Sequence, residues 1–221
     1  CYRPAWEVKS SLRHRALSAV ISNSNTKPDA IVIGAGLAGA AVAHSLALRG
    51  WQVEVLDKAH ALGAGASGLP AGLFATQVSP DNNVLSRITR DGERATVQRA
   101  QELLKHDLEW QVSHLLEHRY AGKRQLPEGP LWPAAGHEWS TKASELQKQA
   151  SGLDTSTSAL WHGIAGWIQT QALVKAQLGH RNIRLSTQSA VAKLISRNNQ
   201  WQCLDASGLV IAQAPQVIIA N

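Results

Sequence analysis

Methionine is absent from the 221-residue chain, and cysteine occurs only as Cys1 and Cys203. Two cysteines are too few for a disulfide framework, which excludes the class of small secreted proteins stapled by disulfides. The first residues also lack the apolar core of a secretory signal peptide. Together these absences favour the reducing cytoplasm, and we expect a cytoplasmic protein.

The two ends of the chain do not look like the ends of a complete protein. The chain starts with Cys1 rather than Met, and it stops at Asn221 directly after QVIIA, an apolar run that predicts a buried strand. We therefore expect a fragment of a longer protein, truncated at the C-terminus and preceded by further sequence at the N-terminus. The hydrophobic content of 44% is normal for a soluble globular protein. From the length of 221 residues we expect one domain, or one domain with a large insertion.

The sequence also has few long hydrophobic runs and no strong excess of charge of one sign. The one long apolar run, from Ala30 to Leu48, contains only His44 and Ser45 as polar residues, but it is built mostly from Ala and Gly rather than Leu and Phe. A β-α-β pattern explains it better than a membrane span. The net charge of +6 favours an anionic partner without proving one. His114, His118 and His137 have no ligand spacing, so we expect no metal site.

The most informative segment is AIVIGAGLAGAAVAHSLALRGWQVEVLDK, which predicts a strand at 31–33, a helix that stops near Gly50 and a second strand at 51–56. In the GxGxxG pattern, the first glycine permits a tight turn, the second lets a pyrophosphate approach the backbone, and the third lets the helix lie close to the sheet. Asp57 falls where a carboxylate accepts hydrogen bonds from a ribose diol. This unit predicts a dinucleotide site, and FAD and NAD both remain open. Its candidate contacts are Gly34, Ala35, Gly36, Leu37, Ala38, Gly39, Asp57 and Lys58.

Small residues follow the second strand at once, in GAGASGLPAGLF from Gly63 to Phe74. An NAD enzyme would usually continue with another helix and strand here. The segment could instead let backbone pass beneath an extended cofactor, with the Ser67 hydroxyl near its phosphates, or it could be a surface loop. The candidate contacts here are Ala66, Ser67, Gly68, Gly72 and Leu73.

Weaker patterns organise the rest of the chain. Residues 1–28 look like a basic linker with a short helix at 12–21, and 81–110 like a helix that Gly92 bends or interrupts. On that helix, Arg87, Arg90 and Arg94 share a face that could neutralise phosphates, although a solvated charged face is the better interpretation. Its expected core positions are Val84, Leu85, Ile88, Ala95, Leu103, Leu104 and Leu108.

Beyond residue 110, Trp132 and Trp139 could stack on a base or a flavin, but aromatic residues of this kind more often anchor a core or loop. We expect helices at 140–150 and from Thr170. A strand that begins near Ala190 and Val191 could present backbone groups to an adenine, or it could be an ordinary meander strand. The expected late strands are 183–185, 191–195, 201–204, 209–212 and 216–220, with a hairpin turn at 205–208.

Taken together, VIGAGLAG, VEVLDK, GAGASGLPAGLF, AGWIQTQAL and the closing WQCLDASGLVIAQAPQVIIAN resemble the FAD-dependent amine oxidoreductases of the D-amino-acid oxidase and glycine oxidase type. The likeness covers nearly everything from Asp29 onward. It implies FAD, held by the residues named above together with Val191, and an α/β fold. In this fold a Rossmann-like FAD-binding domain (29–80 and 166–221, incomplete at the C-terminus) carries an inserted α+β substrate domain (81–165). The resemblance assigns no catalytic residue.

Within the family, the likeness is greatest to the branch that modifies the wobble uridine of tRNA. This implies removal of the carboxymethyl group from 5-carboxymethylaminomethyl-(2-thio)uridine, with tRNA as substrate and a SAM-dependent methyltransferase domain preceding this one. An amine or amino-acid oxidase of the same fold is the alternative, and a non-catalytic dinucleotide-binding module is the alternative of another class. The family commonly has prolines where this chain has Thr170 and Gln171. We expect the fragment alone to bind FAD weakly or not at all.

Overall fold

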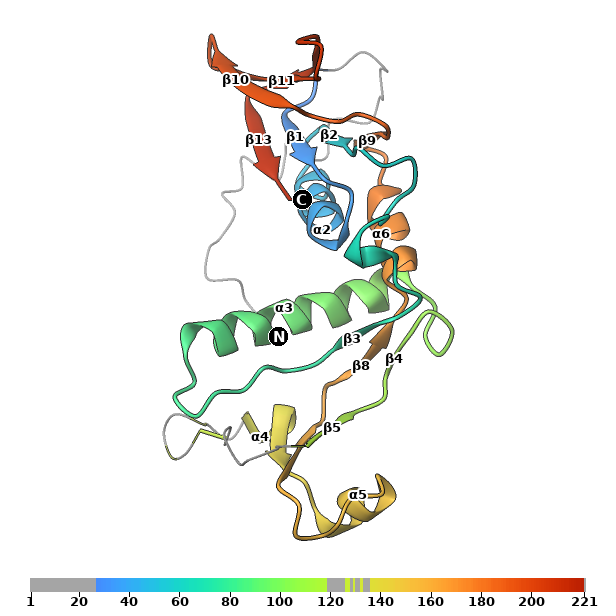
Figure 1. Ribbon diagram of the computed structural model, residues 1–221, viewed down its shortest axis with the longest axis vertical. Coiled ribbons are helices and arrows are strands. Elements are labelled where there is room, and N and C mark those ends of the chain that lie inside the picture. The colour runs from blue at the N-terminus through green and yellow to red at the C-terminus, as the bar shows by residue number, and fades with distance from the viewer. Residues whose placement is uncertain (1–26, 119–125, 128, 130–131, 133–135, 221) are drawn as a thin grey trace. The chain divides into compact units, whose positions relative to one another are not determined.

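The computed structural model describes residues 27–118, 126, 127, 129, 132 and 136–220. The chain divides into two compact units, one formed by Cys1–Gly68 with Val174–Asn221 and the other by Leu69–Leu173 (Figure 1). Nearly all of the predicted linker 1–28, and the whole predicted helix 12–21, lie outside the described residues. The two units are considered one at a time.

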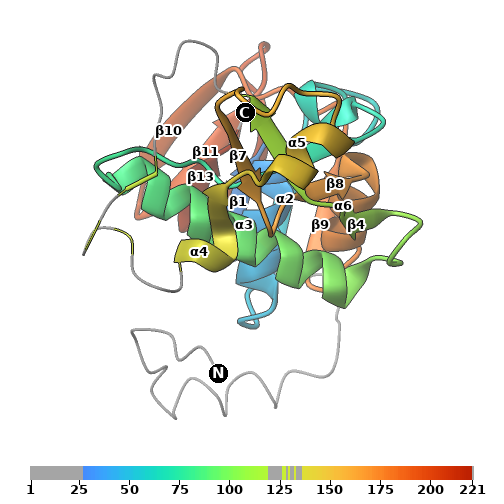
Figure 2. The ribbon, with the colours of Figure 1, turned by 90° about the horizontal axis from the view of Figure 1, so that it is seen from below.

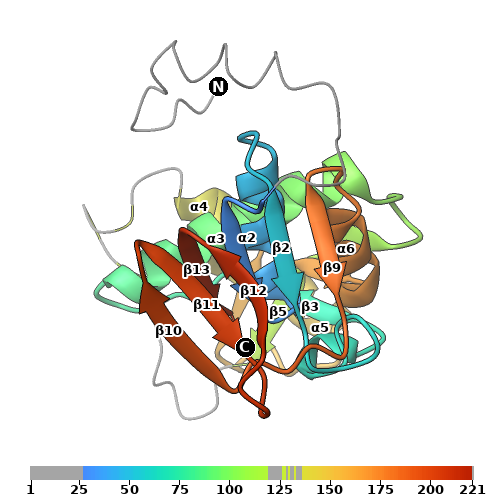
Figure 3. The ribbon, with the colours of Figure 1, turned by 90° about the horizontal axis from the view of Figure 1, so that it is seen from above.

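The first unit is built on a parallel sheet of four strands in the order β13-β1-β2-β9. These strands are β13(Gln216–Ile219), β1(Ala30–Ile33), β2(Val53–Leu56) and β9(Ile183–Ser186). Figure 3 shows β2 and β9 side by side. The two central strands, AIVI and VEVL, are buried on both faces, as parallel strands usually are.

Helix α2(Leu37–Ala47) covers one face of this sheet. Apart from His44, its buried residues are small, namely Gly39, Ala40, Ala43 and Ala47, which lets the helix axis approach the strands closely. Helix α6(Thr170–Leu178) adds Val174 and Leu178 to the same core. As the sequence predicts, the chain turns after α2 at Gly50, which has a φ of 88° and whose N–H donates to the carbonyl of Ala47 at 2.9 Å.

An antiparallel sheet packs on the other face of the parallel sheet. It consists of β10(Lys193–Arg197), β11(Gln200–Leu204) and β12(Val210–Ala214). Buried Cys203 of β11 packs there with Ile31 and Leu56. The predicted hairpin turn at 205–208 is confirmed, because Gly208 N–H donates to the carbonyl of Asp205 at 3.1 Å and Gly208 has a φ of 87°.

The second unit combines two small antiparallel sheets with three helices, which Figure 2 labels. One sheet has the order β3-β8-β4, and the other β5-β7-β6. The elements are β3(Gly72–Phe74), α3(Val84–Leu103), β4(Trp110–Val112), β5(Leu115–His118), α4(Gly136–Trp139), β6(Ser140–Lys142), α5(Glu145–Ala150), β7(Ala159–His162) and β8(Gly166–Ile168). Strand β3 pairs with β8, which joins the beginning and the end of this unit.

Helix α3 differs from its prediction in two ways. It runs without a break through Gly92, because an exposed glycine costs a helix only about 1 kcal/mol and does not force an interruption. Its buried face is not the apolar one, since its buried residues are Ser86, Glu93 and Ala100. Five of the seven expected core positions are exposed, namely Val84, Leu85, Ile88, Ala95 and Leu108, and Leu103 and Leu104 are half-buried.

Two further elements differ from the expectation. The predicted helix at 140–150 is a strand, β6, followed by the short helix α5, because residues 140–142 pair with β7. The predicted strand at 191–195 starts later, since β10 begins at Lys193 and Val191 precedes it.

Candidate functional site

The glycine loop connects the carboxyl end of β1 to the start of α2. Gly34 has a φ of 109°, a conformation that L side chains rarely adopt, and its N–H donates to the carbonyl of Leu56 at 2.8 Å. Gly36 is the N-cap of α2 and provides no side-chain cap, so the first-turn amides face a position that holds no side chain of their own helix. This arrangement gives the helix start the geometry of an anion site.

Gly39 allows the helix to lie against the turn. A Cβ placed at Gly39 would come within 1.8 Å of the carbonyl oxygen of Gly34, a distance that no backbone could tolerate. Only glycine fits this position without moving the helix away from β1. The third glycine of the pattern therefore has the packing role that the sequence predicts for it.

Asp57 lies at the end of β2, and its carboxylate is bound to backbone amides. Oδ2 accepts the Ala35 N–H at 2.6 Å, and Oδ1 accepts the Ala59 N–H at 2.8 Å. The predicted ribose acceptor thus also holds the glycine loop in place. A carboxylate has about four acceptor positions, so two backbone bonds leave capacity for a diol. The side chain of neighbouring Lys58 is exposed.

The small-residue segment after β2 returns to the start of α2. It forms a single turn of 3₁₀ helix, η1(Ala66–Gly68), closed by Gly68 N–H donating to the carbonyl of Gly65 at 2.9 Å. The Ser67 hydroxyl accepts the Leu37 N–H at 3.0 Å. A Cβ at Gly36 would lie 3.2 Å from the same hydroxyl oxygen. Ser67 is therefore at the helix start, where the sequence places the phosphates.

The segment before β10 brings Val191 toward the same end of β2. Ser189 N–H donates to the carbonyl of Asp57 at 2.8 Å, and Gln188 N–H donates to the carbonyl of Ala59 at 3.0 Å. Val191 itself packs on the core beside Leu56. Gly72 and Leu73 belong to β3 of the second unit, where the Leu73 side chain is exposed.

Thr170, one of the two departures from the family pattern, has a structural role in the second unit. Its hydroxyl donates to the carbonyl of Leu69 at 2.9 Å, and the residue is buried. A Cβ at Gly72 would lie 2.8 Å from the Thr170 methyl carbon. Thr170 therefore fixes the segment that leads into β3, a hydrogen bond that proline could not make.

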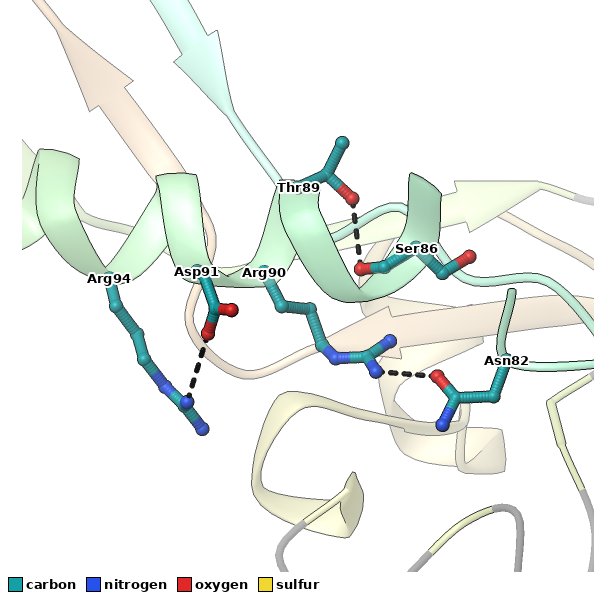
Figure 4. A network of polar contacts seen from close by, with 6 residues as sticks. All are labelled: Asn82, Ser86, Thr89, Arg90, Asp91 and Arg94. Atoms are coloured by element: carbon teal, nitrogen blue, oxygen red, sulfur yellow. Dashed lines mark hydrogen bonds and ion pairs between the residues drawn. The ribbon is translucent and has the colours of Figure 1, made fainter. Parts of the chain in front are cut away.

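Two arginines of the stripe on α3, Arg90 and Arg94, make contacts within the second unit (Figure 4). Arg90 donates to the side-chain oxygen of Asn82 at 2.5 Å, and its guanidinium lies 5.3 Å from the ring centroid of Trp132. Arg94 pairs with Asp91 at 3.4 Å and lies 4.5 Å over Trp139. Burial lowers the pKa of Arg90 from its ordinary value. The two arginines therefore cover the tryptophan rings instead of forming a free phosphate-binding stripe.

Both tryptophans are anchors, as the more common interpretation predicts. Trp132 is 6% exposed and Trp139 is 4% exposed, so neither ring is available as a platform for a base or a flavin. Arg87, the first member of the stripe, remains exposed.

Three buried polar groups escaped the sequence reasoning. His162 is buried between Ser140 and Glu117, with Nδ1 2.8 Å from the serine oxygen and Nε2 3.0 Å from a glutamate oxygen. Because Ser140 is fully buried, this set resembles a nucleophile triad only in composition. Its members are scattered over β5, β6 and β7, and no local spacing signals them.

The other two groups are buried glutamates. Glu54 of β2 pairs with Arg184 of β9 at 2.7 Å, at opposed positions of the two parallel strands. Glu93 of α3 accepts the Thr76 hydroxyl at 2.5 Å, and burial raises its pKa to about 7. Over the part of the chain that the structure describes, no group of three or more His, Cys, Asp or Glu side chains is placed to hold a metal ion. Nor is any described helix long and apolar enough to cross a membrane.

A parallel sheet with a glycine turn at a helix start, and with a carboxylate at the end of the adjacent strand, defines a dinucleotide-binding protein of the Rossmann-like class. The sequence profile of one family, described as FAD dependent oxidoreductase, matches residues 29–221. The chain belongs to this family of oxidoreductases. Membership of this family identifies the cofactor as FAD rather than NAD.

Two curated relatives are both described as tRNA 5-methylaminomethyl-2-thiouridine biosynthesis bifunctional protein MnmC. The relative from Polaromonas naphthalenivorans (strain CJ2) is 44% identical over 223 residues, which cover 99% of this chain and 34% of the relative. The relative from Paracidovorax citrulli (strain AAC00-1) is 46% identical over 199 residues, covering 86% of this chain and 31% of the relative. The chain thus spans about a third of the length of these relatives.

Solved structures show the same fold at low identity. Glycine oxidase from Geobacillus kaustophilus matches with a TM-score of 0.68 at 19% identity, over 88% of this chain and 55% of that one. L-alpha-glycerophosphate oxidase from Mycoplasma pneumoniae with FAD bound matches with a TM-score of 0.67 at 14% identity, over 87% of this chain and 53% of that one. The predicted fold class is confirmed.

Proposed function

We propose that the first unit binds the adenine and pyrophosphate part of FAD. Gly34, Gly36 and Gly39 would leave room for the pyrophosphate over the start of α2, and Asp57 would accept a ribose hydroxyl. The absence of a side chain at the α2 N-cap and the 1.8 Å limit at Gly39 support this assignment. In the first unit the proposed set is Gly34, Ala35, Gly36, Leu37, Ala38, Gly39, Asp57, Lys58, Ala66, Ser67, Gly68 and Val191, and Gly72 and Leu73 of the second unit are proposed separately as FAD contacts.

A matched pair of glycines tests the cofactor assignment. A methyl group at Gly36 would press on the Ser67 hydroxyl and the anion position, whereas one at Gly65 of the same region would meet nothing within 4 Å. We expect Gly36→Ala to weaken FAD binding at least tenfold and Gly65→Ala to leave it within twofold, as measured by quenching of flavin fluorescence in the native gene product. Equal affinities in the two variants would contradict the assignment.

We further propose that the enzyme acts on the wobble uridine of tRNA and converts its carboxymethylaminomethyl group to an aminomethyl group. The single observation that carries this proposal is the identity of 44% to a relative named for tRNA 5-methylaminomethyl-2-thiouridine biosynthesis, over 99% of this chain. When bound, FAD supplies a two-electron acceptor. Oxidation of the substrate C–N bond gives an imine with loss of two electrons and two protons, as a hydride and a proton. Water then cleaves the imine, which leaves the aminomethyl group on the uridine and releases glyoxylate.

The chain's own residues contribute binding and orientation to this reaction. The Asp57 carboxylate and the Ser67 hydroxyl accept the backbone amides of Ala35 and Leu37, and these bonds hold the loop under the proposed pyrophosphate position. Such pre-organisation lowers the ordering cost of binding. No catalytic acid or base is assigned, because hydride removal by a flavin requires orientation of the C–H bond more than a proton-transferring pair.

The proposed organisation follows the bifunctional relatives. A SAM-dependent methyltransferase domain would precede this chain, residues 29–80 and 166–221 would belong to the FAD-binding domain, and 81–165 would form the substrate insertion. The protein would act in the cytoplasm, where tRNA is modified. Inactivation of the gene should make tRNA accumulate the carboxymethylaminomethyl nucleoside, which mass spectrometry of digested tRNA detects.

The substrate is tested directly by anaerobic mixing. The native flavoprotein is mixed with tRNA carrying carboxymethylaminomethyluridine, with the same tRNA lacking the modification, and separately with glycine, sarcosine and D-alanine. We expect bleaching of the flavin absorbance only with the modified tRNA. Bleaching by free amino acids alone would refute the tRNA assignment and favour a small amine oxidase. No bleaching by any amine would favour a non-catalytic binding module.

A further inference from the structure

A cavity of about 880 Å³ lies wholly within the second unit, away from the glycine loop in the sequence. Its volume is in the range of small-molecule sites. Fourteen described residues line it, and they include Lys142, Lys148 and His137 but no Asp or Glu. Hydroxyl groups of Thr141, Ser156, Thr157 and Ser158 complete the polar part of the lining. The cavity is therefore a cationic, hydroxyl-rich site.

The floor of the cavity is rigid. Ala143, Ala159 and Leu160 are buried, and Ala143 N–H donates to the carbonyl of Ala159 at 3.0 Å. Lys142 and Leu160 are opposed in the pairing of β6 with β7. Backbone pairing thus holds the lysine at a fixed position along the wall, and its side chain is exposed.

The second lysine of the lining, Lys148, is held by contacts of its own. Ser144 and Gln147 form a capping box that starts α5, the short yellow helix that carries Lys148 in Figure 1. Lys148 Nζ donates to the carbonyl of Thr155 at 2.7 Å, which ties α5 to the hydroxyl-bearing segment. An ammonium group has three donors, so this bond leaves donors for a ligand.

Asp154, which precedes the hydroxyl-bearing segment in the sequence, is bound to Ser156 and is not part of the lining. Asp154 Oδ1 accepts both the N–H of Ser156 at 2.8 Å and its hydroxyl at 2.5 Å. Trp132 also borders the cavity, but it is 6% exposed and Arg90 covers its ring. The cavity thus offers cations and hydroxyl groups but no free aromatic face for a base. Ammonium groups and hydroxyls recognise phosphate oxygens without reading the base.

We propose that this cavity binds a backbone phosphate of the RNA substrate, independently of the base attached to it. The proposal rests on the proposed function, since an RNA substrate supplies the phosphates. It adds a contact at the second unit that would hold the RNA while the modified uridine reaches the cofactor. Lys142 is the main phosphate ligand, because it lines the cavity with an exposed side chain, whereas Lys148 already donates to Thr155.

The test is salt-dependent binding of a fluorescein-labelled, unmodified anticodon stem-loop RNA to the native gene product, followed by anisotropy. Lys142→Gln is compared with Lys193→Gln, an exposed lysine on β10 that serves as the matched control. We expect Lys142→Gln to weaken binding about fivefold at low salt and to lower the slope of log K against log salt by about 0.7, the value for one phosphate on a single strand. Lys193→Gln should leave both quantities unchanged.

Two further arms separate the possible outcomes. A stem-loop with a scrambled loop sequence should bind equally well and respond equally to Lys142→Gln, and a preference for one sequence would overturn the base-independent proposal. Equal affinity and slope in the two lysine variants, or no RNA binding by the wild-type chain, would also overturn it. Failure here leaves flavin bleaching by modified tRNA intact, whereas failure of the proposed function abolishes that bleaching and leaves the lysine-dependent binding. The two failures are therefore distinguishable.

Discussion

Glu93 provides the sharpest prediction, because it is a carboxyl group buried in α3 where the sequence indicates an exposed charge. The residue is 5% exposed, its Oε2 accepts the Thr76 hydroxyl at 2.5 Å, and its Oε1 is buried with no hydrogen-bond partner among the described residues. Burial raises the pKa to about 7 from the ordinary value of 4.5, although the hydrogen bond from Thr76 opposes the rise. The folded protein therefore prefers the neutral acid.

The sign of the pH effect follows from this preference. Between pH 4.5 and 7 the unfolded chain releases the Glu93 proton while the folded chain keeps it. The contribution of this group is fully favourable below pH 4.5, and it is lost as the pH rises through 7. Each tenfold change in proton affinity is worth about 1.4 kcal/mol, so the loss amounts to about 3 kcal/mol by pH 8.

The perturbation is Glu93→Gln, which keeps the shape and an acceptor for Thr76 but cannot ionise. We expect the variant to be about as stable as the wild type at pH 4.5 and about 3 kcal/mol more stable at pH 8, less the cost of burying the amide N–H₂. The assay is urea unfolding at both pH values, followed by tryptophan fluorescence and analysed as the difference between the two pH values.

Asp91→Asn is the matched control, because Asp91 is an exposed acid on the same helix that forms an ion pair with Arg94. An exposed pair contributes less than about 1 kcal/mol, so we expect Asp91→Asn to change the free energy of unfolding little. If the Glu93→Gln variant shows the same pH dependence as the wild type, the reasoning about the buried carboxyl is refuted.

Three other changes have equally definite expectations. Gly39→Ala should lower the free energy of unfolding by at least about 3 kcal/mol, because its Cβ would overlap backbone atoms. Gly65→Ala should change it little, because its Cβ would meet nothing within 4 Å. Thermal unfolding measures both variants. Ser67→Ala should cost about 1 kcal/mol in urea unfolding, since it removes the acceptor for the Leu37 N–H. Cys203, fully buried with its pKa raised to about 11, should resist thiol reagents at neutral pH until the chain unfolds, and rapid labelling at Cys203 of the folded protein, located by peptide mapping to separate it from Cys1, would contradict its burial.

The glycine turn and the two strands beside it could be predicted because each depends on neighbours in the sequence. The spacing from Gly34 to Gly39 is read within six residues, and the structure needs it for a contact between those same two residues. The apolar strands before and after α2 are likewise local patterns. Here local preference and tertiary packing agree, which makes the prediction safe.

Helix α3 shows the opposite case. Its apolar residues at Val84, Leu85 and Ile88 have helical spacing, so a sequence pattern places them in the core, yet all three are exposed. The buried face carries Ser86 and Glu93, whose hydrogen bonds to Ser79 and Thr76 come from the segment after β3. Periodicity assigns a face by polarity alone and has no means to find polar partners that arrive from elsewhere in the chain.

Asp57 and Ser67 carry the comparison one step further. The sequence assigns both residues to the cofactor, and without a cofactor each accepts a backbone amide of the glycine loop, from Ala35 and Leu37 respectively. These two amides flank Gly36, so the carboxylate and the hydroxyl hold the loop from both sides at the point where the pyrophosphate would approach. A side chain that can accept a hydrogen bond from the ligand can also accept one from the loop, because the ligand and the loop both present donors. The consequence is that substitution of either residue must be judged by stability as well as by FAD affinity, since the loop and the site share the same hydrogen bonds.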